Sequence, residues 1–155
     1  MFKKIISILI VFNLMSHCGF TPIHSNNKNA NFSITSIELE GERILNNYLK
    51  TYLSKFQDDK HNKKFKIKII SNYKKLIYSK DKAANTKNYE LSAEAKITII
   101  TKEKVLKEIT VVEKKIIDKN DDNFEEQKEE RITKQNFASS ISNKIIMELS
   151  ILNDN

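Results

Sequence analysis

Apolar and polar residues alternate along four stretches of the chain, which is typical of strands with one buried face. The most regular alternation covers residues 89–99, where every second position from Tyr89 is apolar. Similar but looser patterns cover residues 32–40 and 64–78. A fourth such pattern covers residues 105–117 and follows residues 89–99 closely enough to form a hairpin with them. The sequence therefore predicts four strands.

Two irregularities are expected within these strands. The apolar phase changes near Ser36, which predicts a bulge, and the alternation loosens between Ile70 and Tyr73, which predicts a bend or bulge there. Ala93 and Ala95 occupy the apolar face of the most regular strand, and their small side chains would let a helix approach closely.

Helical periodicity of apolar residues covers 42–56, with Asn46 and Lys50 on the side expected to face solvent. A second helix is expected from 123 to 151, with Asp121 or Asp122 as its N-cap. Its first half, 125–134, has almost no apolar face, so we expect it to project beyond the sheet or to fray.

The resulting order is strand, helix, strand, strand, strand, helix. Two amphipathic helices and a sheet with one buried face predict an α/β two-layer sandwich, in which both helices pack on a four-stranded mixed sheet. One domain over residues 32–155 accounts for all of these elements.

The N-terminus is more apolar than any later stretch. Lys3 and Lys4 precede an apolar run from Ile5 to Met15, which is typical of a secretory signal peptide over residues 1–17 and too short for a transmembrane helix. Cys18, the only cysteine, follows directly. Met15 and Ser16 fit the processing site of a bacterial lipoprotein, whereas His17 replaces the usual small residue. We expect fatty-acyl chains, palmitate among them, on Cys18 as a membrane anchor, with residues 18–31 as a tether.

The chain has a formal charge of +7, which becomes +5 when Lys3 and Lys4 are removed with the signal peptide. Export argues against a nucleic-acid partner, so an anionic lipid or a phosphorylated glycolipid is the alternative that the charge favours. The candidate contacts for lipopolysaccharide phosphates are Lys64, Lys66, Lys68, Lys74 and Lys75. The competing interpretation is that they are ordinary solvated lysines of a lysine-rich protein.

The residues offer no catalytic or metal site. The three histidines, His17, His24 and His61, lie in the signal peptide, the tether and a polar turn, and no pair has ligand spacing. The chain has two glycines, too few for a glycine-rich phosphate loop. We therefore expect neither an enzyme nor a cofactor-binding or metal-binding protein.

Four motifs occur in the order found in one known family. Cys18-Gly19-Phe20-Thr21-Pro22 resembles the opening of mature LPS-assembly lipoproteins of the LptE family, especially the alphaproteobacterial type. The helix containing Asn47 and Leu49, the Tyr89-Glu90-Leu91 start of a strand and the spacing of Ala138 and Ile141 are similar to later family motifs. The resemblance covers nearly the whole chain and rests on the order and spacing of these motifs.

The resemblance implies a lipoprotein held at the periplasmic face of the outer membrane. Family members plug the β-barrel LptD as a heterodimer, assist the assembly of that barrel and help to insert lipopolysaccharide into the outer leaflet. Two alternatives remain open: an accessory lipoprotein of another outer-membrane machine, such as barrel assembly or a secretin pilotin, and a lipid carrier with a roomy cavity. The small Ala93 and Ala95 favour tight packing over a carrier cavity.

Overall fold

The computed structural model describes residues 31–154 of the chain. Its elements, in chain order, are β1 (Phe32–Gly41), α2 (Arg43–Leu53), the short 3-10 helix η2 (Ser54–Phe56), β2 (Lys63–Lys80), β3 (Thr86–Thr101), β4 (Lys104–Asp118) and α3 (Asn123–Asp154). The predicted signal peptide, Cys18 and the predicted tether lie outside the described residues.

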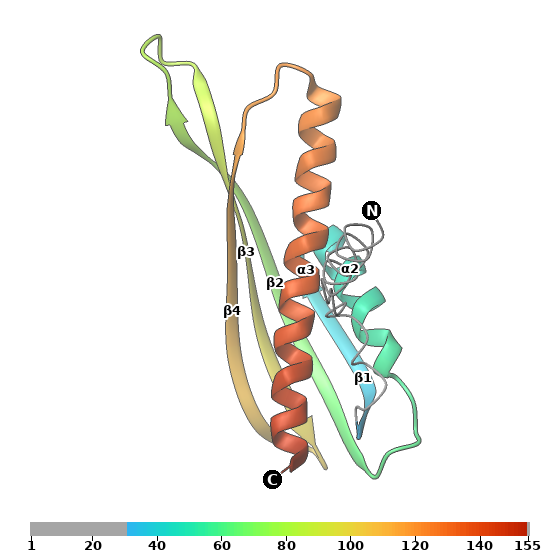
Figure 1. The fold of residues 1–155 in the computed structure, drawn as a ribbon. Helices are drawn as coiled ribbons and strands as arrows, with labels where there is room; N and C mark the ends of the chain where they lie inside the picture. Colours follow the sequence, from blue (N-terminus) through green and yellow to red (C-terminus); the bar gives the residue numbers. More distant parts are fainter. Residues whose placement is uncertain (1–30, 155) are drawn as a thin grey trace, which may run out of the picture.

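The four strands form one sheet in the order β1-β2-β3-β4. β1 pairs with β2 in parallel, and the other two pairs are antiparallel, so the sheet is mixed. Both helices cover the same face of the sheet, and the opposite face has no covering layer among the described residues (Figure 1). This arrangement confirms the predicted two-layer α/β sandwich and the predicted order of its elements.

The core lies between the sheet and the two helices. Alternate residues of β2 and β3 point into it, among them Phe65, Ile67 and Ile97. Ala93 and Ala95 are fully buried at the centre of β3, on the face that the helices cover. From the helices, the core receives Leu45, Leu49, Leu53, Phe137, Ala138, Ile141, Ile145 and Leu149. Each large apolar side chain buried in this way contributes about 1.5–3 kcal/mol to folding.

One predicted irregularity is confirmed and the other is wrong. The register of β1 shifts between Ile34 and Ser36, at the expected bulge. β2 keeps its register with β3 through residues 70–73, and its shifts occur later, between Ile77 and Lys80. The pattern loosens at 70–73 because the inward position there is Ser71, a polar residue that is nevertheless buried.

Ser71 is buried because the end of β1, at Gly41, packs directly against it. Gly41 has a φ of +99°, and a Cβ at this position would lie 1.9 Å from the Ser71 carbonyl oxygen. The backbone N–H of the next residue, Glu42, donates to the Ser71 hydroxyl at 3.0 Å, and that hydroxyl donates to Asn46 Oδ1 at 2.8 Å. Asn46 is therefore buried against the sheet, and the prediction that it faces solvent is wrong.

The start of α3 also differs from expectation. Asp122 accepts a hydrogen bond from the backbone N–H of Phe124 at 2.8 Å, which supports its predicted role at the N-terminus of the helix. The first half of α3 neither frays nor projects: Lys75 on β2 and Lys115 on β4 bind its glutamates. The contact is ionic, which explains the lack of an apolar face. Among residues 31–154, no helix is both long and apolar enough to cross a membrane.

Candidate functional site

The largest surface available to a partner is the face of the sheet opposite the helices, which we call the uncovered face. Its central positions carry polar side chains such as Asn72, Ser92 and Glu94, since the strands alternate strictly between the two faces. Large apolar side chains are also exposed on it: Ile70, Leu76, Val112 and Ile116, each at least 46% exposed. The uncovered face is therefore amphipathic across three strands.

The structure places four of the five candidate lysines on the uncovered face. Lys64, Lys66 and Lys68 follow each other on β2, and their ammonium groups pair with Asp59, Glu103 and Glu40 respectively. Lys74 lies further along the same strand and forms no ion pair among the described residues. Lys75, being the next residue, points to the opposite face and binds α3.

A shallow groove of about 250 Å³ lies on the uncovered face around Lys74. Its walls come from β2, β3 and β4 and include Leu76, Val112 and Lys114. Lys114 is paired with Glu90 at 3.0 Å, so Lys74 supplies the unpaired cation of the groove. The groove could accept one acidic group beside an apolar one.

On the helix side, five charged residues form a cluster between α3, β2 and the start of α2, which we call the ionic cluster: Glu42, Lys75, Glu126, Glu130 and Lys134. Lys75 Nζ lies 2.7 Å from Glu126 and 3.1 Å from Glu130. Lys134 Nζ lies 3.3 Å from Glu130 and 3.4 Å from Glu42. All five side chains are at most 25% exposed, so their charges attract one another more strongly than ion pairs in water do.

The ionic cluster shifts the pKa values of its members. Burial opposes ionisation of Glu130, but hydrogen bonds from Lys75 and Lys134 outweigh it and lower the pKa of Glu130. Burial likewise opposes the charge on Lys75, and hydrogen bonds to Glu126 and Glu130 outweigh it, so that the pKa of Lys75 is raised. Both shifts favour the charged forms of Glu130 and Lys75.

Tyr73 lies beneath this cluster. Lys134 Nζ sits 4.1 Å from the centre of its ring, a cation–π distance. The Tyr73 hydroxyl is buried and has no hydrogen-bond partner among the described residues. Burial, followed by the charge of Glu130, raises the pKa of Tyr73. The residue therefore serves as a neutral platform for Lys134.

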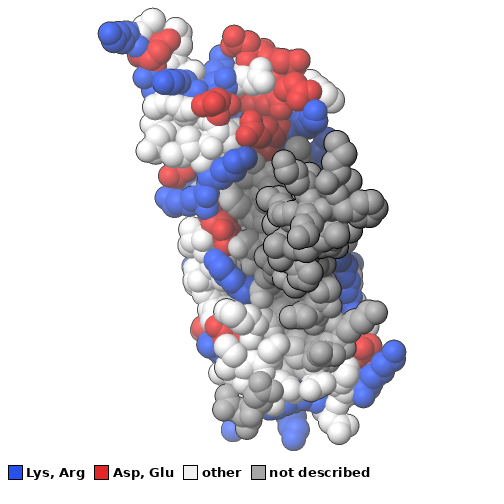
Figure 2. Space-filling model, in the orientation of Figure 1, with Lys and Arg blue, Asp and Glu red and all other residues white. Residues whose placement is uncertain are grey.

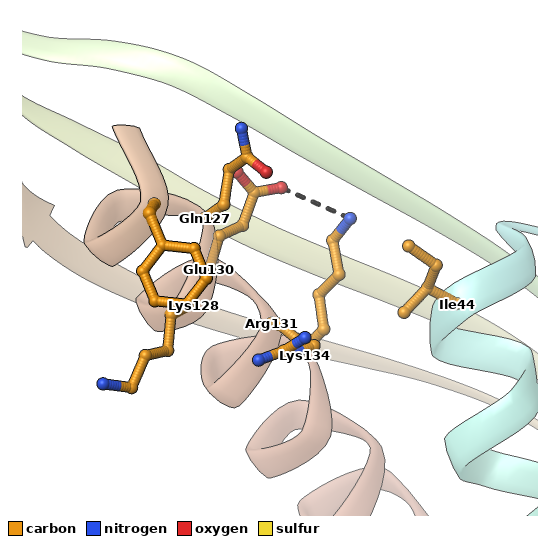
Figure 3. A pocket seen from close by; sticks show the side chains of 7 residues that line it. Ile44, Gln127, Lys128, Glu130, Arg131 and Lys134 are labelled. Carbon is orange, nitrogen blue, oxygen red and sulfur yellow. Dashed lines mark ion pairs between the residues drawn. The ribbon is translucent and has the colours of Figure 1, made fainter. Parts of the chain in front are cut away.

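An open pocket of about 290 Å³ adjoins the ionic cluster, between the starts of α2 and α3. Figure 3 shows Ile44 reaching into it from α2 and Lys134 from α3, with the Lys134–Glu130 pair on its wall. Arg131 and Lys128 line the α3 side. Lys134 is already held by two carboxylates and Lys128 by Glu125, so Arg131 is the cation of this pocket that forms no ion pair with the described residues.

Two groups of residues escaped the sequence analysis. The ionic cluster was missed because its partners are far apart in the chain, as with Lys75 and Glu126, which are 51 residues apart. The apolar residues of the uncovered face could be recognised only in part from the sequence. Ile70 and Val112 each directly follow an apolar residue of the same strand that faces the core. Within residues 31–154, no group of three or more His, Cys, Asp or Glu side chains is placed to hold a metal ion.

The fold is shared with solved structures of bacterial lipoproteins. Rare lipoprotein B of Shewanella oneidensis matches with a TM-score of 0.60 at 12% identity, over 77% of this chain and 97% of that one. Lipoprotein B of Nitrosomonas europaea gives 0.57 at 13%, over 81% and 88%. A protein described as a lipoprotein from Caulobacter crescentus gives 0.55 at 13%, over 76% and 90%. At these identities the likeness establishes a common fold. No family model matches the sequence, and no curated protein is similar to it by sequence.

Proposed function

We propose that this chain is an outer-membrane lipoprotein, acylated at Cys18, that occupies an LptD-type β-barrel and assists the insertion of lipopolysaccharide. In this proposal the protein is a non-enzymatic partner that binds no metal or cofactor. The observation that carries it is the common fold with rare lipoprotein B of Shewanella oneidensis, which extends over nearly the whole of that chain. The motif that starts at Cys18 supports the same assignment from a separate part of the sequence.

The uncovered face is the surface proposed to meet the barrel. A plug must bury one face against the inner wall of a barrel, and that wall is polar. The uncovered face offers Asn72, Ser92 and Glu94 for polar contacts, beside the exposed Leu76 and Val112. The helix side also exposes apolar side chains, among them Ile44, Phe124 and Met147, but they are spread over two helices, whereas those of the uncovered face lie on strands of one sheet.

The ion pairs of the five candidate lysines indicate which of them is free to bind a phosphate of lipopolysaccharide. A phosphate bound to Lys64, Lys66 or Lys68 would replace the carboxylate with which that lysine already pairs, so the net gain in binding free energy would be small. Lys74 has no such partner among the described residues and adjoins exposed Leu76, which could contact an acyl chain. We therefore favour Lys74 over the other four candidates.

Affinity purification tests this function. The tagged chain, extracted in mild detergent from membranes of its own organism, should bring down the barrel of the lipopolysaccharide translocon. Val112→Arg on the uncovered face should reduce that recovery at least fivefold, and Asn136→Arg on the exposed side of α3 is the matched control. Recovery of a barrel-assembly or secretin subunit in place of the translocon barrel would overturn the proposal.

The anchor has a separate test. Cys18→Ser should abolish incorporation of labelled palmitate and leave the protein either uncleaved or released from the membrane. Unchanged labelling and membrane attachment in that variant would refute acylation at Cys18. The outcome does not depend on which barrel, if any, the domain enters.

A further inference from the structure

Lysines gather at the end of the molecule where the described chain begins. β1 and β2 start at this end, β3 and β4 are joined there, and α3 ends there (Figure 1). We call it the basic end and define it by the lysines of these segments: Lys60, Lys63, Lys64, Lys66, Lys102 and Lys104. An open concavity of about 680 Å³ lies at its centre, lined by Asn31, His61 and four of these lysines.

Most of these cations are not neutralised by neighbouring side chains. Lys64 and Lys66 pair with Asp59 and Glu103. Lys63 Nζ donates to the backbone carbonyl of Asn153 at 2.7 Å, which leaves its charge uncompensated. The remaining three, Lys60, Lys102 and Lys104, are exposed and form no ion pair among the described side chains. The basic end therefore presents four lysines without an ion pair among the described side chains, and three of them, Lys60, Lys63 and Lys102, line the concavity.

The opposite end of the long axis is rich in carboxylates where α3 starts, whereas the β2–β3 hairpin at that end carries Lys80, Lys82 and Lys87. Asp118, Asp121, Asp122, Glu125, Glu126, Glu129 and Glu130 follow one another between β4 and the first turns of α3. Figure 2 shows acidic side chains gathered at the top of the molecule beside some lysines, and further lysines along its length and at the bottom. Near an anionic surface, such a charge distribution favours one orientation, with the basic end toward the surface.

The position of the basic end relative to Cys18 points to a membrane as that surface. This step rests on the proposed acylation of Cys18. Twelve residues lie between Cys18 and Asn31, and the thirteen steps from one Cα atom to the next span at most about 45 Å. β2 alone, from Lys63 to Lys80, spans about 56 Å. An anchor on Cys18 thus keeps the basic end within reach of the lipid headgroups.

We propose that the basic end binds the anionic phospholipid headgroups of the membrane that holds the acyl chains. A lysine close to an anionic membrane surface increases binding about fivefold. The attraction decays over about 10 Å at 0.1 M salt, so lysines at the far end of β2 contribute almost nothing in this orientation. The interaction orients the domain on its anchor before any protein partner is engaged.

Vesicle flotation of the full 155-residue chain carrying Cys18→Ser tests the proposal, because no acyl chain then contributes. Partition coefficients are measured on phosphatidylcholine vesicles with and without 30% phosphatidylglycerol. The first variant adds Lys60→Gln, Lys102→Gln and Lys104→Gln. The matched control adds instead the same change at three exposed lysines of the opposite end, Lys80, Lys82 and Lys87. Equal urea midpoints establish that both variants fold.

The preference for anionic over neutral vesicles should fall at least tenfold in the basic-end variant and less than twofold in the control. Residues 1–17 are present in all three proteins, so their contribution to vesicle binding cancels when the anionic preferences of the proteins are compared. A chain with no anionic preference, a basic-end variant that keeps it, or equal losses in both variants would each overturn the proposal. No barrel or acyl group is present, so these failures leave the proposed function untouched, and a failed barrel purification leaves the vesicle result untouched.

Discussion

Replacing Gly41 with alanine tests how β1 passes into α2. Gly41 has a φ of +99°, where an L-residue with a Cβ is strained by about 1–2 kcal/mol. The new methyl group would also lie 1.9 Å from the Ser71 carbonyl oxygen, so the two segments must separate. Separation breaks the hydrogen bonds from the Glu42 N–H to the Ser71 carbonyl and hydroxyl oxygens, at 3.2 and 3.0 Å. Loss of the partners of a part-buried donor costs about 1–3 kcal/mol.

Together these effects predict that Gly41→Ala lowers the free energy of unfolding by about 2–5 kcal/mol. A domain of this kind has about 5–15 kcal/mol in total, so the loss is easily measured. Urea unfolding followed by circular dichroism gives the value. Glu38→Ala, an exposed change three residues earlier in β1, is the control and should alter stability by less than 1 kcal/mol. A loss below 1 kcal/mol in Gly41→Ala would refute the close approach at Ser71.

Three further substitutions test the helix side of the sheet. Glu130→Gln should cost about 1–3 kcal/mol at pH 7. Because the pKa of Glu130 is lowered in the fold, its contribution is present above the ordinary glutamate pKa and disappears as the pH falls through the lowered value. Urea titrations at pH 7 and pH 3 should show a smaller difference at pH 3, and a constant difference would contradict the ion pairs. Tyr73→Phe should preserve or raise stability, by up to about 1 kcal/mol in urea unfolding, since the buried hydroxyl lacks a partner and the ring still faces Lys134. A loss above 1 kcal/mol would contradict this. Ala95→Leu should overpack the core and lower the urea-derived stability by about 1–3 kcal/mol, whereas Lys96→Leu on the uncovered face should not. Equal effects would refute the assigned faces.

The periodicity of the sequence predicted the features that depend on residues close together in the chain. The four strands, both helices and the bulge near Ser36 follow from local alternation or helical spacing, because burial of one face imposes these patterns directly. The buried positions of Ala93 and Ala95 follow for the same reason.

Features that depend on distant residues could not be predicted in this way. Asn46 is polar and therefore looked solvent-exposed, yet it is buried with Ser71, from which it is separated by 25 residues. The first half of α3 looked unsupported, because its supports Lys75 and Lys115 lie on two strands and resemble surface residues in the sequence. Strict alternation along β2 already separates Lys75 from Lys74, but the binding of Lys75 to Glu126 and Glu130 of α3 could be found only in the structure.

The central claim is that the uncovered face meets an LptD-type barrel. The most direct measurement is in-cell photocrosslinking, with a photoreactive amino acid placed at Val112 on the uncovered face and, as control, at Asn136 on α3. The account predicts an adduct with the lipopolysaccharide-translocon barrel from position 112 and none, or far less, from position 136. An adduct from position 112 with a barrel-assembly or secretin subunit, or translocon adducts only from position 136, would contradict it.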